Sequence, residues 1–389
     1  MDFRFAPEQE EFRAQVRAFV ESELPVEWER IDPEGERAWE ITCEFQRKLA
    51  DKKWLAMAWP PALGGLGADL LTQLIYHETM DYYHAPAFTM AVAWVGPAVM
   101  LYGNEEQKAR LLPRMATGED VYCTLYSEPG AGSDLAAMQT KAVLDGDDYV
   151  ITGQKVWTSG AHHANLGWLA ARTDPTASKH RGLSTFVVDV DSPGLTVRPL
   201  INMAGQHAFN EVFFDGVRVP KANLIGEPGR GWYNIATALE FERSGIEWIA
   251  KARRRLDQII AHVREHRDIL ENNPQLRFEL ADRAIEVEVG TLLCYRTIHL
   301  AIQGKAMTYE ASASKVYNSE LTQRVAQTGM KVFGPYAGLG RDDPRSPLTG
   351  QLTHSIQSGY LWTFANTIGA GSSEIQRNII ASRGLGLPR

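Results

Sequence analysis

Hydrophobic and polar positions follow two different periods along the chain. Up to about residue 118 apolar residues recur every three to four positions, as on one face of a helix. In the segment PEQEEFRAQVRAFVESEL this spacing places four residues on one face: Phe12, Val16, Phe19 and Val20. From about residue 119 short β-branched and aromatic runs are bounded by turn residues, and the sequence DGDD predicts a hairpin. Near Gly231 the helical period returns.

The order of these segments is helices, strands and again helices, without alternating βαβ units. This order predicts an α+β multidomain fold. We expect an N-terminal helical domain at 1–118, a middle β-domain (barrel or sandwich) at 119–228 and a C-terminal helical bundle at 229–389. The Pro/Gly-rich stretch FGPYAGLGRDDPRSPLTG is expected to be a loop.

The segment NIATALEFERSGIEWI, residues 234–249, places a carboxylate in an apolar stripe. Ile235, Leu239, Ile246 and Ile249 share one helical face, and Glu242 fills the remaining place in it. Glu242 is either at the edge of the stripe, reaching water or a distant arginine, or held in an apolar slot. In the slot, desolvation would raise its pKa towards neutrality, which suits a general base for a weakly acidic C–H.

Composition narrows the class of protein. The chain has 389 residues, 44% hydrophobic, and a net charge of −8, which argues against nucleic acid or an anionic membrane as the main partner. Three widely spaced cysteines predict neither a disulfide framework nor a zinc site. The first twenty residues have no apolar signal-peptide core, so we expect a cytoplasmic protein.

Two polar motifs in the strand region are candidate ligand contacts. SEPGAGSD, residues 127–134, has glycines that let backbone N–H groups approach an anion, although a tight surface turn also explains it. KVWTSG places Trp157 beside two hydroxyl residues, where a flat heteroaromatic ring can stack and form a hydrogen bond, or where the indole belongs to a core. Neither the adjacent His162 and His163 nor any Cys/His spacing suggests a metal site.

Taken together, these segments resemble the acyl-CoA dehydrogenase family over nearly the whole chain. The matching motifs are YSEPGAGSD, ITGQKVWTSGA, NEVFFDGVRVPKANLIGEPGRGW and GAGSSEIQRNIIASRGLGLPR. The resemblance implies the family fold, with a C-terminal four-helix bundle and FAD between the domains. It also implies α,β-dehydrogenation of an acyl-CoA thioester: a glutamate takes the α-proton, the β-hydrogen leaves as hydride to flavin N5, and electrons pass to electron-transfer flavoprotein.

By position, the resemblance also implies the roles of individual residues. The implied FAD contacts are Thr124, Leu125, Tyr126, Ser127, Gly132, Ser133, Trp157, Thr158, Ser159, Ser372 and Glu374. Ser133 is also implied on the CoA side, and Arg243 at the acyl-CoA entrance.

The position of the base departs from many members of the family. In those members the base precedes the glycine of an EGTSQIQR-like motif, where this chain has Ala370, which cannot take a proton. Other members carry the base in an ER pair on the first long helix after the β-domain, and Glu242-Arg243 matches that pair. We therefore predict Glu242 as the catalytic base, with Glu374 as the weaker candidate.

A second departure concerns the flavin contacts that one subunit lends to another. An RxxFG-like segment is absent, and KVFGPYAG replaces QxxGGxG, with Lys331 in the place of the glutamine; a long extra loop, DDPRSPLTGQLTHSIQSGYLWTFAN, follows. This combination resembles members that form α2β2 heterotetramers, and a homotetramer with altered contacts also fits. Three functional alternatives stay open: an acyl-CoA oxidase, a flavin monooxygenase of the same fold, and a non-catalytic partner subunit.

Overall fold

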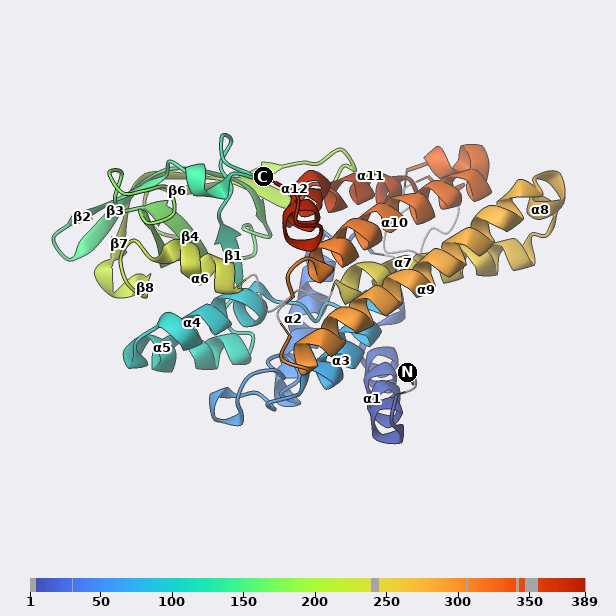
Figure 1. Cartoon of the computed structure of the whole chain (residues 1–389), viewed down its shortest axis with the longest axis horizontal. Coiled ribbons are helices and arrows are strands. Elements are labelled where there is room, and N and C mark those ends of the chain that lie inside the picture. The colour runs from blue at the N-terminus through green and yellow to red at the C-terminus, as the bar shows by residue number, and fades with distance from the viewer. Residues whose placement is uncertain are drawn as a thin grey trace. The chain divides into compact units, whose positions relative to one another are not determined.

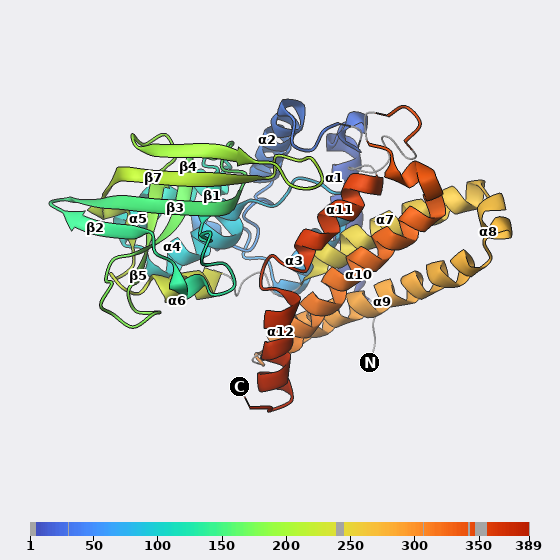
Figure 2. The same ribbon diagram turned by 90° about the horizontal axis from the view of Figure 1, so that it is seen from above.

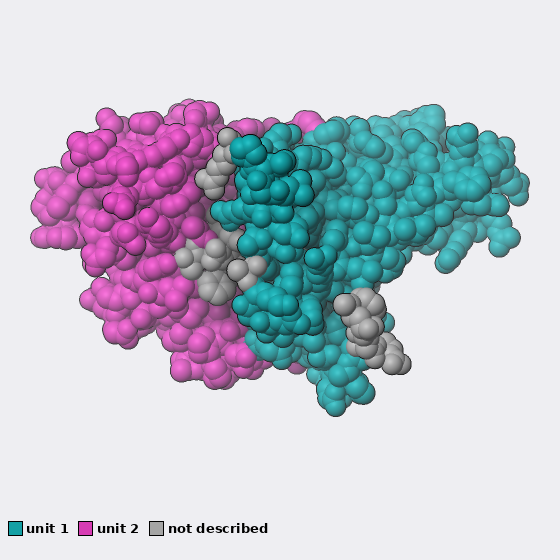
Figure 3. All heavy atoms as spheres, in the orientation of Figure 1, with its two compact units in different colours: residues 1–45, 68–86, 243–389 teal, residues 46–67, 87–242 magenta. Residues whose placement is uncertain are grey.

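The computed structural model describes residues 5–29, 31–238, 245–305, 307–340, 343–346 and 356–388. The chain forms two compact units (Figure 3). The helical unit comprises residues 1–45, 68–86 and 243–389, and the sheet unit comprises residues 46–67 and 87–242. The predicted N-terminal domain is thus shared between the two units, and the predicted domain boundaries remain predictions.

The α-helices of both units are labelled in chain order (Figure 1). Their bounds are α1 Pro7–Glu23, α2 Glu36–Asp51, α3 Leu70–Tyr82, α4 Gly96–Tyr102, α5 Glu105–Ala116, α6 Gly231–Ala238, α7 Ile246–Glu265, α8 Asp268–Asn272, α9 Gln275–Ile302, α10 Glu310–Phe333, α11 Ile356–Asn366 and α12 Ser373–Ile379.

The sheet unit is built on one strongly antiparallel sheet. Its strands are β1 Tyr122–Leu125, β2 Lys141–Asp145, β3 Asp148–Ser159, β4 Leu166–Arg172, β5 Leu183–Asp189, β6 Leu195–Leu200, β7 Phe209–Pro220 and β8 Leu224–Ile225. Their order is β6-β7-β3-β2-β4-β5-β8, and β1 pairs with β4 in parallel. The predicted DGDD hairpin is confirmed, since β2 and β3 pair up to Asp145–Asp148 and Gly146 has a φ of +64°.

Large apolar side chains fill the space between this sheet and helices α4 and α5. Trp168 of β4 is fully buried in a cluster that includes Val99 of α4 and Leu112 of α5. A second cluster on the sheet contains Leu125, Phe186 and other strand residues. Through Tyr149 and Ile151, the second cluster also anchors the first half of β3.

In the helical unit, α7, α9 and α10 run side by side (Figures 1 and 2). Helix α3 packs on α7 and α9, and α1 packs on α3. The predicted apolar face of α1 is confirmed, because Val16, Phe19 and Val20 are buried. Leu74 of α3 belongs to the same core cluster as the inner residues of α7, α9 and α10. None of the helices within the described ranges is long and apolar enough to cross a membrane.

The prediction of one continuous helical stripe over residues 234–249 is wrong. Helix α6 ends at Ala238, and α7 begins at Ile246 after Gly245, whose φ of +67° is left-handed. Ile235 packs in a cluster of the sheet unit, whereas Ile246 and Ile249 pack in the core of the helical unit. A glycine in this conformation stops the helix, and the apolar period continued across the break because both sides are buried independently.

The long loop predicted before the C-terminal motif is partly helical. Residues 356–366 form α11, with Ile356, Gly359 and Thr363 buried. Within FGPYAGLG, residues 334–338 form a short 3₁₀ turn. The helix was missed because its buried positions include a glycine and a threonine, which do not form a regular apolar stripe.

Helices α7, α9 and α10 approach closely at Gly290. A Cβ atom there would overlap the amide of Asn318 and lie 2.7 Å from Cδ1 of Ile249. We expect Gly290→Val to lower the free energy of unfolding by about 1–3 kcal/mol through overpacking, measured by urea denaturation. Gly338→Val is the control, because no heavy atom lies within 4 Å of its Cβ position. Equal losses in both variants would contradict this packing.

Candidate functional site

The glycine-rich segment after β1 is a folded turn with an exposed tip. Glu128 and Ala131 exchange both backbone hydrogen bonds, at 3.1 and 3.0 Å. No heavy atom lies within 4 Å of the Cβ positions of Gly130 and Gly132, so backbone is accessible there. This openness is what close approach of a ligand to backbone N–H groups requires.

The predicted contacts along this segment differ in exposure. Leu125 is fully buried, Thr124, Tyr126 and Ser127 are half-buried, and Gly132 and Ser133 are exposed. A hydrogen bond from the N–H of Val156 to the carbonyl of Ser127, at 2.9 Å, joins the segment to β3. The structure therefore brings the predicted contacts of 124–133 next to those on β3.

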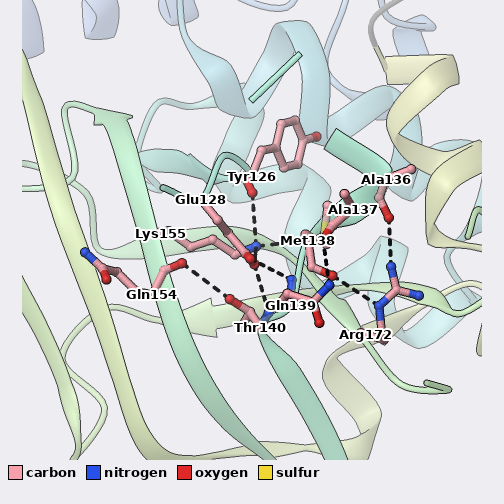
Figure 4. Close-up of polar contacts among 10 residues, drawn as sticks. All are labelled: Tyr126, Glu128, Ala136, Ala137, Met138, Gln139, Thr140, Gln154, Lys155 and Arg172. Carbon is pink, nitrogen blue, oxygen red and sulfur yellow. Dashed lines mark hydrogen bonds and ion pairs between the residues drawn. The ribbon is translucent and has the colours of Figure 1, made fainter. Parts of the chain in front are cut away.

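A buried ion pair anchors the same segment to β3 (Figure 4). Lys155 of β3 has no exposed side-chain surface, and its Nζ lies 2.8 Å from Oε1 of Glu128. It also donates to the carbonyl of Tyr126 at 3.0 Å. Oε2 and Oε1 of Glu128 accept the N–H groups of Gln139 and Thr140 at 2.6 and 2.9 Å.

The far end of the segment is held by β4. Nε and Nη2 of Arg172 donate to the carbonyls of Met138 and Ala136 at 3.1 and 2.7 Å (Figure 4). Lys155 and Arg172 together connect both ends of the loop 126–140 to the sheet. The sequence analysis did not group Glu128, Lys155 and Arg172, because their partners are distant in sequence. The only signal was that Lys155 and Arg172 are charged residues within strand-like segments.

The Glu128–Lys155 pair remains charged at neutral pH. Burial lowers the pKa of Lys155 to about 8, although the carboxylate of Glu128 acts in the opposite direction. Burial also raises the pKa of Glu128, but Lys155 and the hydrogen bonds from Thr140 and Gln139 outweigh it and keep this pKa below its usual value. The loop is therefore anchored by a pair of opposite charges at neutral pH.

Trp157 presents an exposed indole from a distorted point in β3. Lys155 pairs with Val212 and Thr158 with Asn210, so Val156 and Trp157 stand opposite a single residue, which makes a β-bulge. Trp157 has a φ of +60°, and its side chain is 57% exposed. A left-handed conformation costs a bulky residue about 1–3 kcal/mol and is concentrated at functional sites.

The neighbours of Trp157 define a surface that suits a flat ring. Phe209 lies edge-on to the indole at 5.8 Å between centroids. Ser159 is half-buried, whereas Thr158 is 99% buried, with an Oγ1 that has no partner among the described residues. A core tryptophan, the alternative interpretation of KVWTSG, is therefore wrong, and Thr158 faces the interior rather than the exposed surface.

Ser372 and Glu374 belong to the helical unit. Ser372 caps α12, accepting the N–H of Ile375 at 3.4 Å. Glu374, in the first turn, lines an open groove of about 350 Å³ between α10 and α12. Its own backbone N–H, Ser372, Arg377 and Lys315 all lower the pKa of Glu374, which makes its carboxylate a weak base. Ala370, before the motif, has a φ of +54°.

Glu242 and Arg243 lie outside the described residues, at the point in the sequence where one unit ends and the other begins. A neighbouring carboxyl, Glu247 in the first turn of α7, is described. Burial raises the pKa of Glu247, and Asp81 adds to this rise, while Lys251 opposes it. Lys251 pairs with Asp81 at 3.2 Å. The sequence analysis did not single out Glu247 as a candidate residue.

Comparison with known families covers the chain from end to end. Three family models match: "Acyl-CoA dehydrogenase, N-terminal domain" at residues 6–119, "middle domain" at 123–217 and "C-terminal domain" at 229–385. The chain belongs to the acyl-CoA dehydrogenase family, whose members are flavoprotein oxidoreductases. The predicted family and the predicted order of helical, β and helical domains are thereby confirmed.

Individual relatives are similar over their full length. Acyl-CoA dehydrogenase FadE26 of Mycobacterium tuberculosis is 33% identical over 402 residues, covering 100% of this chain and 99% of that protein. The solved structure "Tcur3481-Tcur3483 steroid ACAD" is 34% identical, with a TM-score of 0.90 and complete coverage of both chains. The ChsE4-ChsE5 complex of Mycobacterium tuberculosis is 32% identical, with a TM-score of 0.86 and the same coverage.

The ion pair beneath the loop gives a test of its anchoring role. Lys155→Met leaves the Glu128 carboxylate buried without its cation, so we expect a loss of about 3–5 kcal/mol in the free energy of unfolding, measured by urea denaturation. In Lys155→Met/Glu128→Gln the buried charge is gone while an amide oxygen still accepts a backbone N–H, so part of this loss should be recovered. A double variant that is less stable than the single variant would contradict the role of the pair.

Proposed function

We propose that this chain binds FAD and dehydrogenates an acyl-CoA thioester between Cα and Cβ, giving the trans-2-enoyl-CoA. The observation that carries this proposal is the match of all three acyl-CoA dehydrogenase domains, combined with an exposed, strained indole beside an open glycine-rich loop. At Trp157 and the neighbouring glycine-rich loop, the sequence motifs and the local geometry both support a flavin-binding surface.

The described residues fit an isoalloxazine ring and its phosphates. Trp157 offers a stacking face and Ser159 a hydroxyl, while the backbone around Gly130 and Gly132 is open to an anion. Thr124, Leu125, Tyr126, Ser127, Ser133 and Thr158 support this surface, and Ser372 and Glu374 are the contacts that we propose from the helical unit. When bound, FAD supplies the hydride acceptor of the oxidation.

We propose Glu242 as the residue that takes the α-proton, and Arg243 and Ser133 as substrate contacts, with Arg243 at the acyl-CoA entrance. The motif supports Glu242 because Ala370 occupies the other known position of the base. The exposed Glu374, with its lowered pKa, is poorly suited to accept a proton from carbon. Glu247 has a raised pKa, but the ER motif does not include it.

A bulky acyl chain is the substrate class that we propose, including steroid side chains. In this family, a base on the helix after the β-domain accompanies branched, long or bulky substrates. One structure matched over both full chains is described as a steroid acyl-CoA dehydrogenase. We also propose electron-transfer flavoprotein as the acceptor and the cytoplasm as the compartment.

We propose assembly as an α2β2 heterotetramer with a second acyl-CoA dehydrogenase-like chain. Helix α9 exposes an apolar stripe of Phe278, Ile285, Val289 and Leu292, at 71, 63, 39 and 44%. Lys331, in the place of the expected glutamine, pairs with Glu279 of α9 at 2.7 Å. A chain that uses this position for its own ion pair needs another chain to supply the flavin contact.

The assigned base can be tested by conservative substitution. Glu242→Gln should keep the fold and FAD but slow flavin reduction by about two to four orders of magnitude, because an amide cannot accept the α-proton. Anaerobic stopped-flow absorbance with an acyl-CoA panel measures the rate. Glu247→Gln is the matched control and should reduce flavin at a rate near that of the parent protein. Glu374→Gln, which alters a proposed FAD contact, should lose far less of this rate than Glu242→Gln.

If Glu247→Gln loses the reaction and Glu242→Gln retains it, the base is misassigned. Rapid reoxidation of the reduced parent protein by air would instead support the oxidase or monooxygenase alternative.

The partner proposal predicts a difference between the chain alone and the co-expressed pair. Expressed alone, it should retain FAD weakly, and co-expression with a sister chain that carries the missing RxxFG-like and QxxGGxG segments should give a flavin-saturated 2:2 complex in native mass spectrometry. A homotetramer with full FAD occupancy in the absence of any other chain would exclude the heterotetramer.

A further inference from the structure

Asn210 forms a hydrogen-bond junction directly beside the bulge of β3. It is fully buried at the start of β7, opposite Thr158. Its Nδ2 donates to the carbonyl of Thr158 at 3.1 Å and lies 3.1 Å from Nδ1 of His162. Its Oδ1 lies 2.9 Å from Nε2 of His207.

These contacts determine which atoms donate. The carbonyl of Thr158 can only accept, so the NH₂ of Asn210 must face it. The second N–H of that group then points to Nδ1 of His162, which therefore accepts and carries its proton on Nε2. The remaining carbonyl oxygen of Asn210 accepts from the Nε2–H of His207.

The rings of His162, His163 and His207 lie against one another beside this junction. His162 and His207 stack at 3.9 Å between centroids, and His163 lies 4.1 Å from His162. Burial, together with the neighbouring His163 and His207, lowers the pKa of His162 to about 4. No group of three or more His, Cys, Asp and Glu side chains within the described ranges is arranged to hold a metal ion.

The junction acts on the residue that follows the strained tryptophan. Trp157 adopts a φ of +60° where the regular pairing of β3 and β7 is interrupted, so its conformation needs support from its neighbours. The carbonyl of Thr158 is the first backbone group after Trp157 that a buried side chain holds. We propose that Asn210, oriented by His207 and His162, is a positioning residue that keeps Trp157 and Ser159 in place for the flavin.

The connection to the flavin rests on the proposed function, whereas the support of the bulge does not. Asn210→Asp is nearly isosteric but lacks both N–H donors. His207→Phe keeps the ring stack and removes the donor to Asn210, and His207→Gln restores an N–H donor. His163→Gln is the control, since it leaves all three hydrogen bonds of Asn210 in place.

The first readout is hydrogen–deuterium exchange of residues 155–160 in the protein as purified, with or without flavin. Loss of a buried hydrogen bond should raise exchange there about tenfold in Asn210→Asp and His207→Phe. His207→Gln and His163→Gln should match the parent. Unchanged exchange in both Asn210→Asp and His207→Phe would overturn the positioning role, and His207→Phe keeps the test valid if Asn210→Asp does not fold.

The second readout is FAD affinity, followed by quenching of flavin fluorescence, together with the visible flavin spectrum. We expect the same two variants to bind FAD about tenfold more weakly, with a shifted spectrum, and His207→Gln to recover both. A raised exchange rate with unchanged affinity and spectrum would contradict the flavin contact of Trp157, and with it that part of the proposed function, while the support of the bulge would stand. The two failures are therefore distinguishable.

Discussion

An ammonium group that is buried away from water needs hydrogen-bond acceptors within the protein. For the ammonium group of Lys155, this requirement determines how the candidate site is arranged. Lys155 is surrounded by the carboxylate of Glu128 and the carbonyl of Tyr126. Because Glu128 also accepts two N–H groups from the end of the loop, a single charge fixes both the start and the end of the glycine-rich segment. Lys155 lies two residues before Trp157, so the same strand that holds the loop presents the indole. The ion pair therefore ties the loop to the strand that presents the indole.

The sequence correctly predicted the elements that are determined by residues close together in the chain. The face of α1 and the DGDD hairpin follow from period and turn chemistry within a few residues, and both were predicted correctly. The prediction of a continuous helix over 234–249 was wrong because the apolar period does not show which hydrophobic core each residue enters. Gly245 interrupts the helix between residues of two different cores. Helix α11 was missed because two of its buried residues, Gly359 and Thr363, do not contribute to an apolar stripe.

The site could be predicted only as far as its motifs extended. Motifs located Trp157 and the glycine-rich segment, but not the bulge, which depends on the register between β3 and β7. The partners of Lys155 and Asn210 are up to 52 residues away in sequence and come together only through the sheet. The role of Glu242 rests on family resemblance. The proposed heterotetramer rests on the same sequence departures, together with the exposed apolar stripe of α9 and the Lys331–Glu279 pair.

The conformation of Trp157 has a consequence for how this position evolves. Glycine or asparagine adopts a left-handed backbone more readily than tryptophan, so either would relieve strain and favour the folded state. The exposed indole in turn contributes little to the core, since more than half of it faces solvent. Selection for fold stability and selection for an aromatic surface therefore oppose each other at residue 157. A stability-driven consensus design that replaced this tryptophan would yield a sturdier protein with an empty ring-binding face.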